Sequence, residues 1–114
     1  MHKDNRLKTK SDFSNLYINS KRLINNELIL ILKPNNCTLS RFGFSIKKKF
    51  GTAVKRNKIK RRLKESIRRT NIIGGWDIVF IPRKNIKTKN YQQIELSIKN
   101  LLIRAGLLNK KVEI

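Results

Sequence analysis

Acidic residues are scarce in this sequence, and their scarcity is its most informative feature. Only 7 of the 114 residues are Asp or Glu, against 28 Lys or Arg, which gives a formal net charge of +21. Such an excess of one sign repels itself in a compact chain and favours a partner that neutralises it. Nucleic acid, an anionic membrane surface and an acidic protein carry the required charge.

Cysteine and long apolar runs are also scarce. The single Cys37 excludes an internal disulfide and is typical of a reducing compartment, so we expect a cytoplasmic protein. No apolar run approaches the roughly 20 residues of a membrane span, and no apolar signal-peptide core follows the first residues. A membrane location is therefore not expected, and nucleic acid becomes the leading partner.

Catalytic groups are scarce as well. A protein nuclease needs metal-binding carboxylates or histidines for acid–base work. The one histidine is His2, and no two acids have the spacing of metal ligands: Asp4, Asp12, Glu27, Glu65, Asp77, Glu95 and Glu113. We therefore expect no catalytic residue, no metal ligand and no cofactor bound by the polypeptide itself.

The apolar residues fall in clusters that predict one folded domain over residues 1–114, with a basic, flexible segment at residues 1–10. Three segments are predicted strands: residues 27–33, 41–47 and 76–81. In the second of these, alternation places Phe42, Phe44 and Ile46 on one face.

Three segments are predicted helices: a short one after Ser11, residues 53–69, and residues 90–106. In the second, Ile59, Leu63 and Ile67 recur every four residues, and the third begins at an N-capping Asn90 and ends at Gly106. The order of helix, two or three strands, helix, strand and helix predicts an α+β two-layer sandwich with one sheet.

Positive charge is concentrated in residues 47–69, which hold 12 Lys or Arg and one acid, Glu65. Like charges four residues apart, such as Arg56 and Lys60, destabilise a helix by about 0.2–0.5 kcal/mol per pair. A solvated surface is the alternative interpretation, but the nearly uniform sign favours a surface matched to phosphates. Duplex DNA is an alternative target; few of these side chains read base edges, which favours recognition of RNA by shape and backbone.

Residues 50–64 carry a motif, Phe-Gly-Thr-Ala-Val-Lys-Arg-Asn-Lys-Ile-Lys-Arg-Arg-Leu-Lys. It resembles the signature of the protein subunit of bacterial ribonuclease P, the ribonucleoprotein that removes the 5′ leader from precursor tRNA. Residues 5–7, 43–46 and 76–84 resemble other segments of that family, so the resemblance covers most of the chain. The sequence departs from the family where Lys58 replaces a common arginine, because a point charge replaces a forked donor.

The resemblance implies a fold, a set of partners and separate roles for the RNA and the protein. The fold is an αβββαβα sandwich with one mostly antiparallel sheet and a left-handed βαβ crossover. The partners are ribonuclease P RNA and precursor tRNA, with no obligate protein partner. The RNA carries the active site and requires Mg²⁺, while the protein promotes binding of substrate and metal ions.

Two sets of site residues follow from the resemblance. Contact with the catalytic RNA is assigned to Arg56, Asn57, Lys58, Lys60, Arg61 and Lys64. A cleft for the single-stranded leader is assigned to Phe13, Tyr17, Ile29, Ile31, Ser45 and Lys49. Three alternatives stay open: Phe13 as a core residue, Asn57 as a helix cap, and Trp76 as a stacking platform rather than a partly buried anchor.

Three other functions compete with this interpretation. A ribosomal or other structural RNA-binding protein has the same composition, and only the motif at residues 50–64 argues against it. A DNA-compacting protein is disfavoured by the mixed fold and the localised basic helix. A self-sufficient nuclease is disfavoured by the missing acid–base groups.

Overall fold

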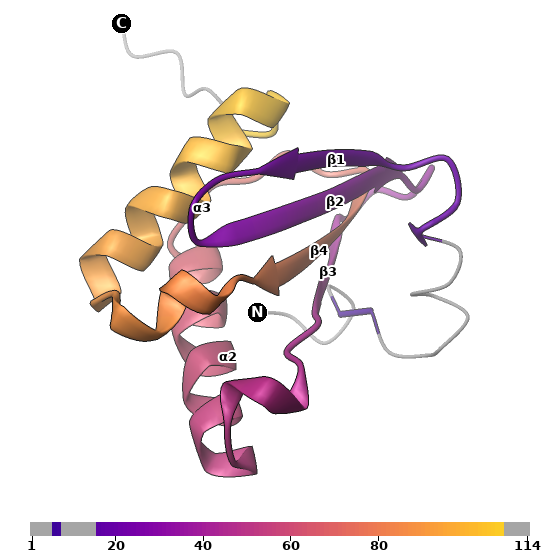
Figure 1. The fold of residues 1–114 in the computed structure, drawn as a ribbon. Coiled ribbons are helices and arrows are strands. Elements are labelled where there is room, and N and C mark those ends of the chain that lie inside the picture. Colours follow the sequence, from indigo (N-terminus) through magenta and orange to yellow (C-terminus); the bar gives the residue numbers. More distant parts are fainter. Residues whose placement is uncertain (1–5, 8–15, 109–114) are drawn as a thin grey trace, which may run out of the picture.

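A four-stranded sheet lies at the centre of the computed structural model, which describes residues 6–7 and 16–108 (Figure 1). The strands are β1 (Lys21–Ile24), β2 (Leu28–Pro34), β3 (Arg41–Phe44) and β4 (Trp76–Pro82), in the spatial order β1-β2-β4-β3. β2 pairs antiparallel with β1 and with β4, and β3 pairs parallel with β4. This mostly antiparallel sheet confirms the predicted fold class.

Two helices, α2 (Ala53–Arg68) and α3 (Tyr91–Ala105), cover the same face of the sheet (Figure 1). Two short 3₁₀ helices, η2 (Lys48–Phe50) and η3 (Lys84–Thr88), precede them. Because α2 joins the parallel neighbours β3 and β4, the β3–α2–β4 unit is the expected crossover, and its left hand stays a prediction. Most of the helix predicted after Ser11 lies outside the described residues.

Local side chains set the ends of both helices. The Thr52 hydroxyl accepts a hydrogen bond from the Lys55 amide at 3.3 Å and begins α2. Asn90 and Gln93 each accept from the other's backbone amide at 2.9 Å, a capping box that begins α3. Gly106 ends α3 with φ 71°, a left-handed conformation that glycine adopts without steric cost. Both predicted ends of α3 are confirmed.

Alternation along β2 divides the apolar residues between the two faces of the sheet. Leu28, Leu30 and Leu32 point toward the helices and belong to the larger cluster, which we call the helix-side core. Ile29 and Ile31 point the other way. The smaller cluster on this second face consists of Leu7, Leu16, Ile31 and Val79, with Ile29 and Ile81 packed against it.

The structure differs from the strand predictions in two places. The strand expected over residues 41–47 ends at Phe44, because the chain leaves the sheet there to form η2, which buries Phe50 in the helix-side core. Ser45 still donates its amide to the Phe80 carbonyl at 3.1 Å. The strand β1 had no residue-level prediction, although a third strand in this region was allowed for.

Candidate nucleic-acid interface

The basic surface of α2 arises because its apolar residues after the first turn lie on the inner side. Leu63 and Ile67 are buried in the helix-side core, and Ile59 is half-buried against it. At 3.6 residues per turn these three residues form one stripe, so most other positions point outward, Ser66 excepted. Eight of the other 13 positions are Lys or Arg. Packing of the apolar stripe therefore stabilises α2 against the repulsion between the positive charges on its outer side.

One side of α2, next to the edge strand β3, carries the largest group of these side chains, and we call it the β3 flank. Its members recur at spacings of three and four residues: Asn57, Lys60, Arg61, Lys64 and Arg68. Two shallow hollows along this flank, of about 250 and 270 Å³, both include Arg6 and Lys64. The flank thus extends to Arg6.

Arg6 reaches this flank because the chain beside it pairs with β3. Arg6 forms an isolated parallel bridge with Phe42, and the Leu7 amide donates to the Phe42 carbonyl at 2.9 Å. Leu7 is buried in the second-face cluster and anchors the segment. The sequence analysis treated this region as a flexible basic start; the lone apolar Leu7 was the available signal that part of it is fixed.

Crowding of cations perturbs Lys64. Burial lowers the pKa of its ammonium, and the neighbouring charges of Lys60 and Arg6 lower it further. The one acid of the helix, Glu65, is engaged with Arg68 at 2.7 Å and with Arg69 at 3.6 Å. A bound phosphate would therefore neutralise charges on the β3 flank that the described residues leave uncompensated.

The six residues predicted to contact the catalytic RNA do not all share this flank. Asn57, Lys60, Arg61 and Lys64 lie together on it. Lys58 is exposed on the opposite side of the helix, and Arg56 is half-buried, with its enclosed Nε lacking a hydrogen-bond partner. Asn57 is exposed inside the helix and Thr52 is the cap, so the alternative that Asn57 caps the helix is wrong.

Half of the residues predicted to line the leader cleft lie on or next to the second face of the sheet. Tyr17 is 49% exposed and follows Leu16, which is buried in the second-face cluster. Ile29 is half-buried at the rim of that cluster. Ile31 is 5% exposed, so it can support the floor of a cleft but offers almost no surface to a ligand. Phe13 lies outside the described residues.

The other two members of the predicted cleft lie beyond the end of β3. Ser45 is half-buried, and Lys49 is exposed on η2. The Lys49 ammonium lies 5.9 Å from the centre of the Phe50 ring, and the Lys49 carbonyl accepts from the Lys87 ammonium at 3.3 Å. Phe50 belongs to the helix-side core, so these contacts place Lys49 beside α2 and η3 and not beside Tyr17.

Two conspicuous residues of β4 have structural roles. Trp76 is half-buried against the helix-side core, which confirms the prediction of an anchor. Asp77 accepts from the Arg41 Nε at 2.8 Å and Nη2 at 2.7 Å, and from the Asn35 amide at 3.0 Å. This ion pair links β3 to β4, and the Asp77 carboxylate therefore has a structural role.

Within residues 6–7 and 16–108, no three His, Cys, Asp or Glu side chains are grouped so as to hold a metal ion. In the same residues, no helix is long and apolar enough to cross a membrane.

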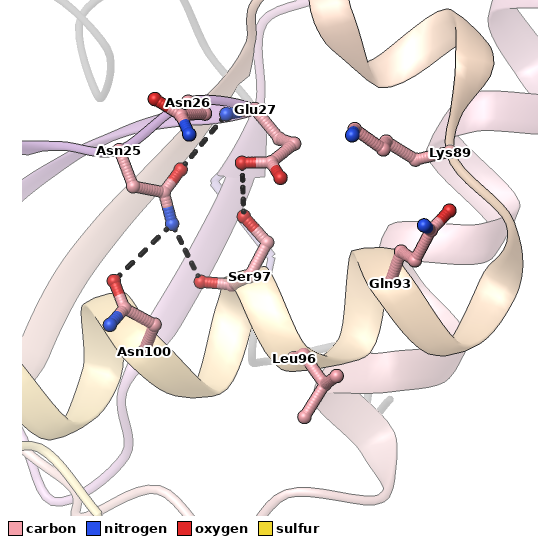
Figure 2. Close-up of a pocket in the computed structure, with 8 residues that line it drawn as sticks. All are labelled: Asn25, Asn26, Glu27, Lys89, Gln93, Leu96, Ser97 and Asn100. Carbon is pink, nitrogen blue, oxygen red and sulfur yellow. Dashed lines mark hydrogen bonds between the residues drawn. The ribbon is translucent and has the colours of Figure 1, made fainter.

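A polar pocket at the other end of the molecule, of about 420 Å³, does not suit a phosphate (Figure 2). Its walls join the β1–β2 turn to α3, and the Asn25 amide donates to the Ser97 carbonyl at 3.0 Å. Its charged members are Glu27 and Lys89, of opposite sign. Figure 2 shows the hydrogen bonds that connect Asn25, Glu27, Ser97 and Asn100. The polar groups of this pocket therefore attach the β1–β2 turn to α3.

A basic helix on an α+β sandwich, extended by Arg6 along the edge of the sheet, defines a small protein whose surface suits a polyanion such as nucleic acid. Residues 1–106 match the family described as Ribonuclease P. The chain therefore belongs to the ribonuclease P protein family, which gives it a role in tRNA processing as part of an endoribonuclease.

Individual relatives agree with this assignment. A "Ribonuclease P protein component" of Clostridium botulinum (strain Langeland) is 37% identical over 110 residues, covering 94% of this chain and 99% of the relative. One from Dehalococcoides mccartyi (strain CBDB1) is 41% identical, covering 99% and 94%. The RNase P protein from Thermotoga maritima superposes with a TM-score of 0.81 at 35% identity, covering 87% of this chain and 96% of that one. A mutant of the Staphylococcus aureus RNase P protein gives 0.85 at 31% identity, covering 93% and 92%.

Proposed function

We propose that this chain binds the catalytic RNA of ribonuclease P through the β3 flank of α2 and through Arg6. The observation that supports this is the continuous run of cations from Arg6 to Arg68 in a member of the ribonuclease P protein family. Arg61 can present two parallel donors to phosphate oxygens, and Lys60 and Lys64 add point charges. Backbone recognition of this kind suits a folded RNA.

The second face of the sheet is the proposed site for the single-stranded 5′ leader of precursor tRNA. Tyr17 offers an exposed aromatic ring, and Ile29 offers part of an apolar floor. Stacking of a base on an aromatic side chain contributes about 1–3 kcal/mol and does not depend strongly on sequence. Phe13 keeps its predicted role in this cleft. Lys49, near Phe50 and α2, is better placed for the catalytic RNA than for the leader.

The chemistry itself is proposed to belong to the RNA and its Mg²⁺ ions, with the protein promoting their productive binding in the cytoplasm. A surface of nearly uniform positive charge repels divalent cations, so the protein is unsuited to hold them alone. Its part is to neutralise phosphates, which lowers the repulsion between catalytic RNA and substrate.

Reconstitution tests this function. The purified protein should leave precursor tRNA intact, and it should restore cleavage at the 5′ leader when added to a ribonuclease P RNA at physiological Mg²⁺. The RNA alone at the same low Mg²⁺ is the control and should cleave much more slowly. Cleavage by the protein alone that disappears on mutation of a carboxylate would overturn the proposal.

A further inference from the structure

The side of α2 that faces away from β3 carries a second group of cations, and the predicted RNA contacts include one of them, Lys58. Here α2, η2 and η3 enclose a groove of about 420 Å³. Lys55, Lys58 and Arg62 line it from α2, and Lys87 lines it from η3. We call it the η3 groove. None of the residues that line it is acidic.

This groove is separate from the β3 flank. With about 100° of rotation per residue, Lys55, Lys58 and Arg62 form a stripe centred about 170° around the helix from the stripe of Lys60 and Lys64. A helix with its side chains is about 10–12 Å across, so phosphates bound on the two sides lie on opposite sides of that cylinder. One RNA strand that follows Lys60 and Lys64 along the helix axis therefore does not reach the η3 groove.

The groove is also built differently from the β3 flank. The half-buried Ile59 lies at its base, and Phe50, Ile86 and Ile94 are buried beneath it. The Lys87 ammonium is held above Phe50, 5.5 Å from the centre of its ring, by donating to the Lys49 carbonyl. Cations around the half-buried Ile59 suit a nucleotide strand, because phosphates can meet the rim while a ribose or base covers this apolar centre.

We propose that the η3 groove binds a second strand of the ribonuclease P RNA, so that α2 is held between two RNA segments. This inference rests on the proposed function, because it takes the same RNA as the partner. It assigns RNA contacts to Lys55, Arg62 and Lys87, and it explains why α2 carries cations on both sides when a helix lying on one strand would need them on one.

Site-directed cleavage from tethered iron-EDTA tests the proposal. The exposed Cys37 is first replaced, Cys37→Ser, and a single cysteine is then introduced by Lys60→Cys or by Lys87→Cys. In the assembled holoenzyme with precursor tRNA, each tether should cut the catalytic RNA, at two sets of nucleotides that do not overlap. The Cys37→Ser protein treated with the same reagent gives the background.

Each result has one meaning. Cuts from position 60 without cuts above background from position 87 would overturn the η3 groove and keep the proposed function. Cuts from position 87 confined to precursor tRNA, or coinciding with those from position 60, would also overturn it. If neither position yields cuts in the catalytic RNA, the proposed function fails with it.

Salt dependence provides an independent measurement. A Lys55→Gln/Lys87→Gln protein should bind the catalytic RNA with a logarithmic salt slope smaller by about 1.5, because each lost phosphate contact removes about 0.7–0.9. A Lys21→Gln/Lys99→Gln protein loses the same charge on β1 and α3 and should keep the wild-type slope. Equal slopes for the two double variants would show that the groove binds no phosphate.

Discussion

Arginine and lysine on the β3 flank differ in what they can contribute. Arg61 is exposed and combines charge with a fixed fork of donors. Arg61→Ala should weaken assembly with the catalytic RNA by about 1–3 kcal/mol, roughly 5- to 150-fold in Kd, the range of a charge-assisted contact. Arg61→Lys should recover only part of this loss because it keeps the charge without the fork. Binding titrations at fixed salt measure both, and equal affinity of the alanine variant and the wild type would exclude Arg61 from the interface.

Lys64 should show a conflict between stability and binding. Its pKa is lowered, so its charged form is less favourable in the folded than in the unfolded chain. This penalty is present while Lys64 is protonated in both states, and it is relieved as pH rises through the lowered folded-state pKa. Lys64→Gln should therefore raise the free energy of unfolding at pH 7, by about 0.2–0.5 kcal/mol for each relieved repulsion, and weaken RNA binding.

Urea unfolding at pH 7 and at more alkaline pH measures this difference, which should shrink as the pH rises. Lys99→Gln is the matched control: Lys99 lies 3.7 Å from Glu95, so its loss should not stabilise the protein. A Lys64→Gln protein that is less stable than the wild type at pH 7 would contradict the repulsion argument.

Among the elements, the parallel pair β3 and β4 is linked by the ion pair between Arg41 and Asp77. Asp77 has a side chain 12% exposed, and its partner Arg41 is 32% exposed. Asp77→Ala should lower the free energy of unfolding by about 2 kcal/mol, less than the 3–5 kcal/mol of a fully buried pair because water reaches Arg41. Glu95→Ala, which breaks the exposed pair with Lys99, should cost at most about 0.5 kcal/mol. The denaturant midpoints of the two variants measure this difference. Equal midpoints would mean that the Arg41–Asp77 pair does not stabilise the sheet.

The elements with local signals were predictable from sequence. The recurrence of Ile59, Leu63 and Ile67 located α2, and Asn90 and Gly106 located the ends of α3. The end of the strand at Phe44 was not predictable, because alternation continues through Ile46 while the backbone already leaves β4. The pairing of Arg6 with β3 depends on a contact between residues far apart in the sequence, which no local pattern encodes.

The same limit applies to the candidate site. The family resemblance assigned Lys60, Arg61 and Lys64 to the catalytic RNA, and helix geometry places these three residues on one side of α2. The position of Lys87 beside α2 depends on how η3 folds back over Phe50, and the sequence analysis therefore missed it. Lys49 was assigned to the leader by resemblance, and its contacts with Phe50 and Lys87 arise from the turn after β3.

At the scale of the whole molecule, the two faces of the sheet should have separable functions. Replacing Phe13 and Tyr17 by alanine should spare assembly with the catalytic RNA but reduce the preference for precursor over mature tRNA. The expected loss is about 1–3 kcal/mol for each base that no longer stacks, because only the precursor has a leader. Titration of the reconstituted holoenzyme with both tRNA forms measures the preference.

Folding must be checked in that experiment, since Phe13 is also a possible core residue. Circular dichroism of the double variant and a Tyr17→Ala single variant serve this purpose, because Tyr17 is exposed and its loss should not unfold the chain. Leu96→Ala removes an exposed apolar side chain from α3 and should leave the preference unchanged. A folded double variant that prefers the precursor as strongly as the wild type does would exclude the second face as the leader site.

α2 connects β3 to β4, two strands that pair with each other, and this connection also affects how quickly the protein is degraded in a cell. Proteases that cut after lysine or arginine need an extended stretch of backbone, and α2 offers many such residues on a closed helix. Opening the helix would expose Leu63 and Ile67, which are buried in the helix-side core. It would also disturb the connection between β3 and β4. Its degradation therefore tracks unfolding of the domain, and not the number of exposed cleavage sites. Because RNA binds the folded chain, assembly stabilises it, and subunits made in excess of the RNA are degraded first.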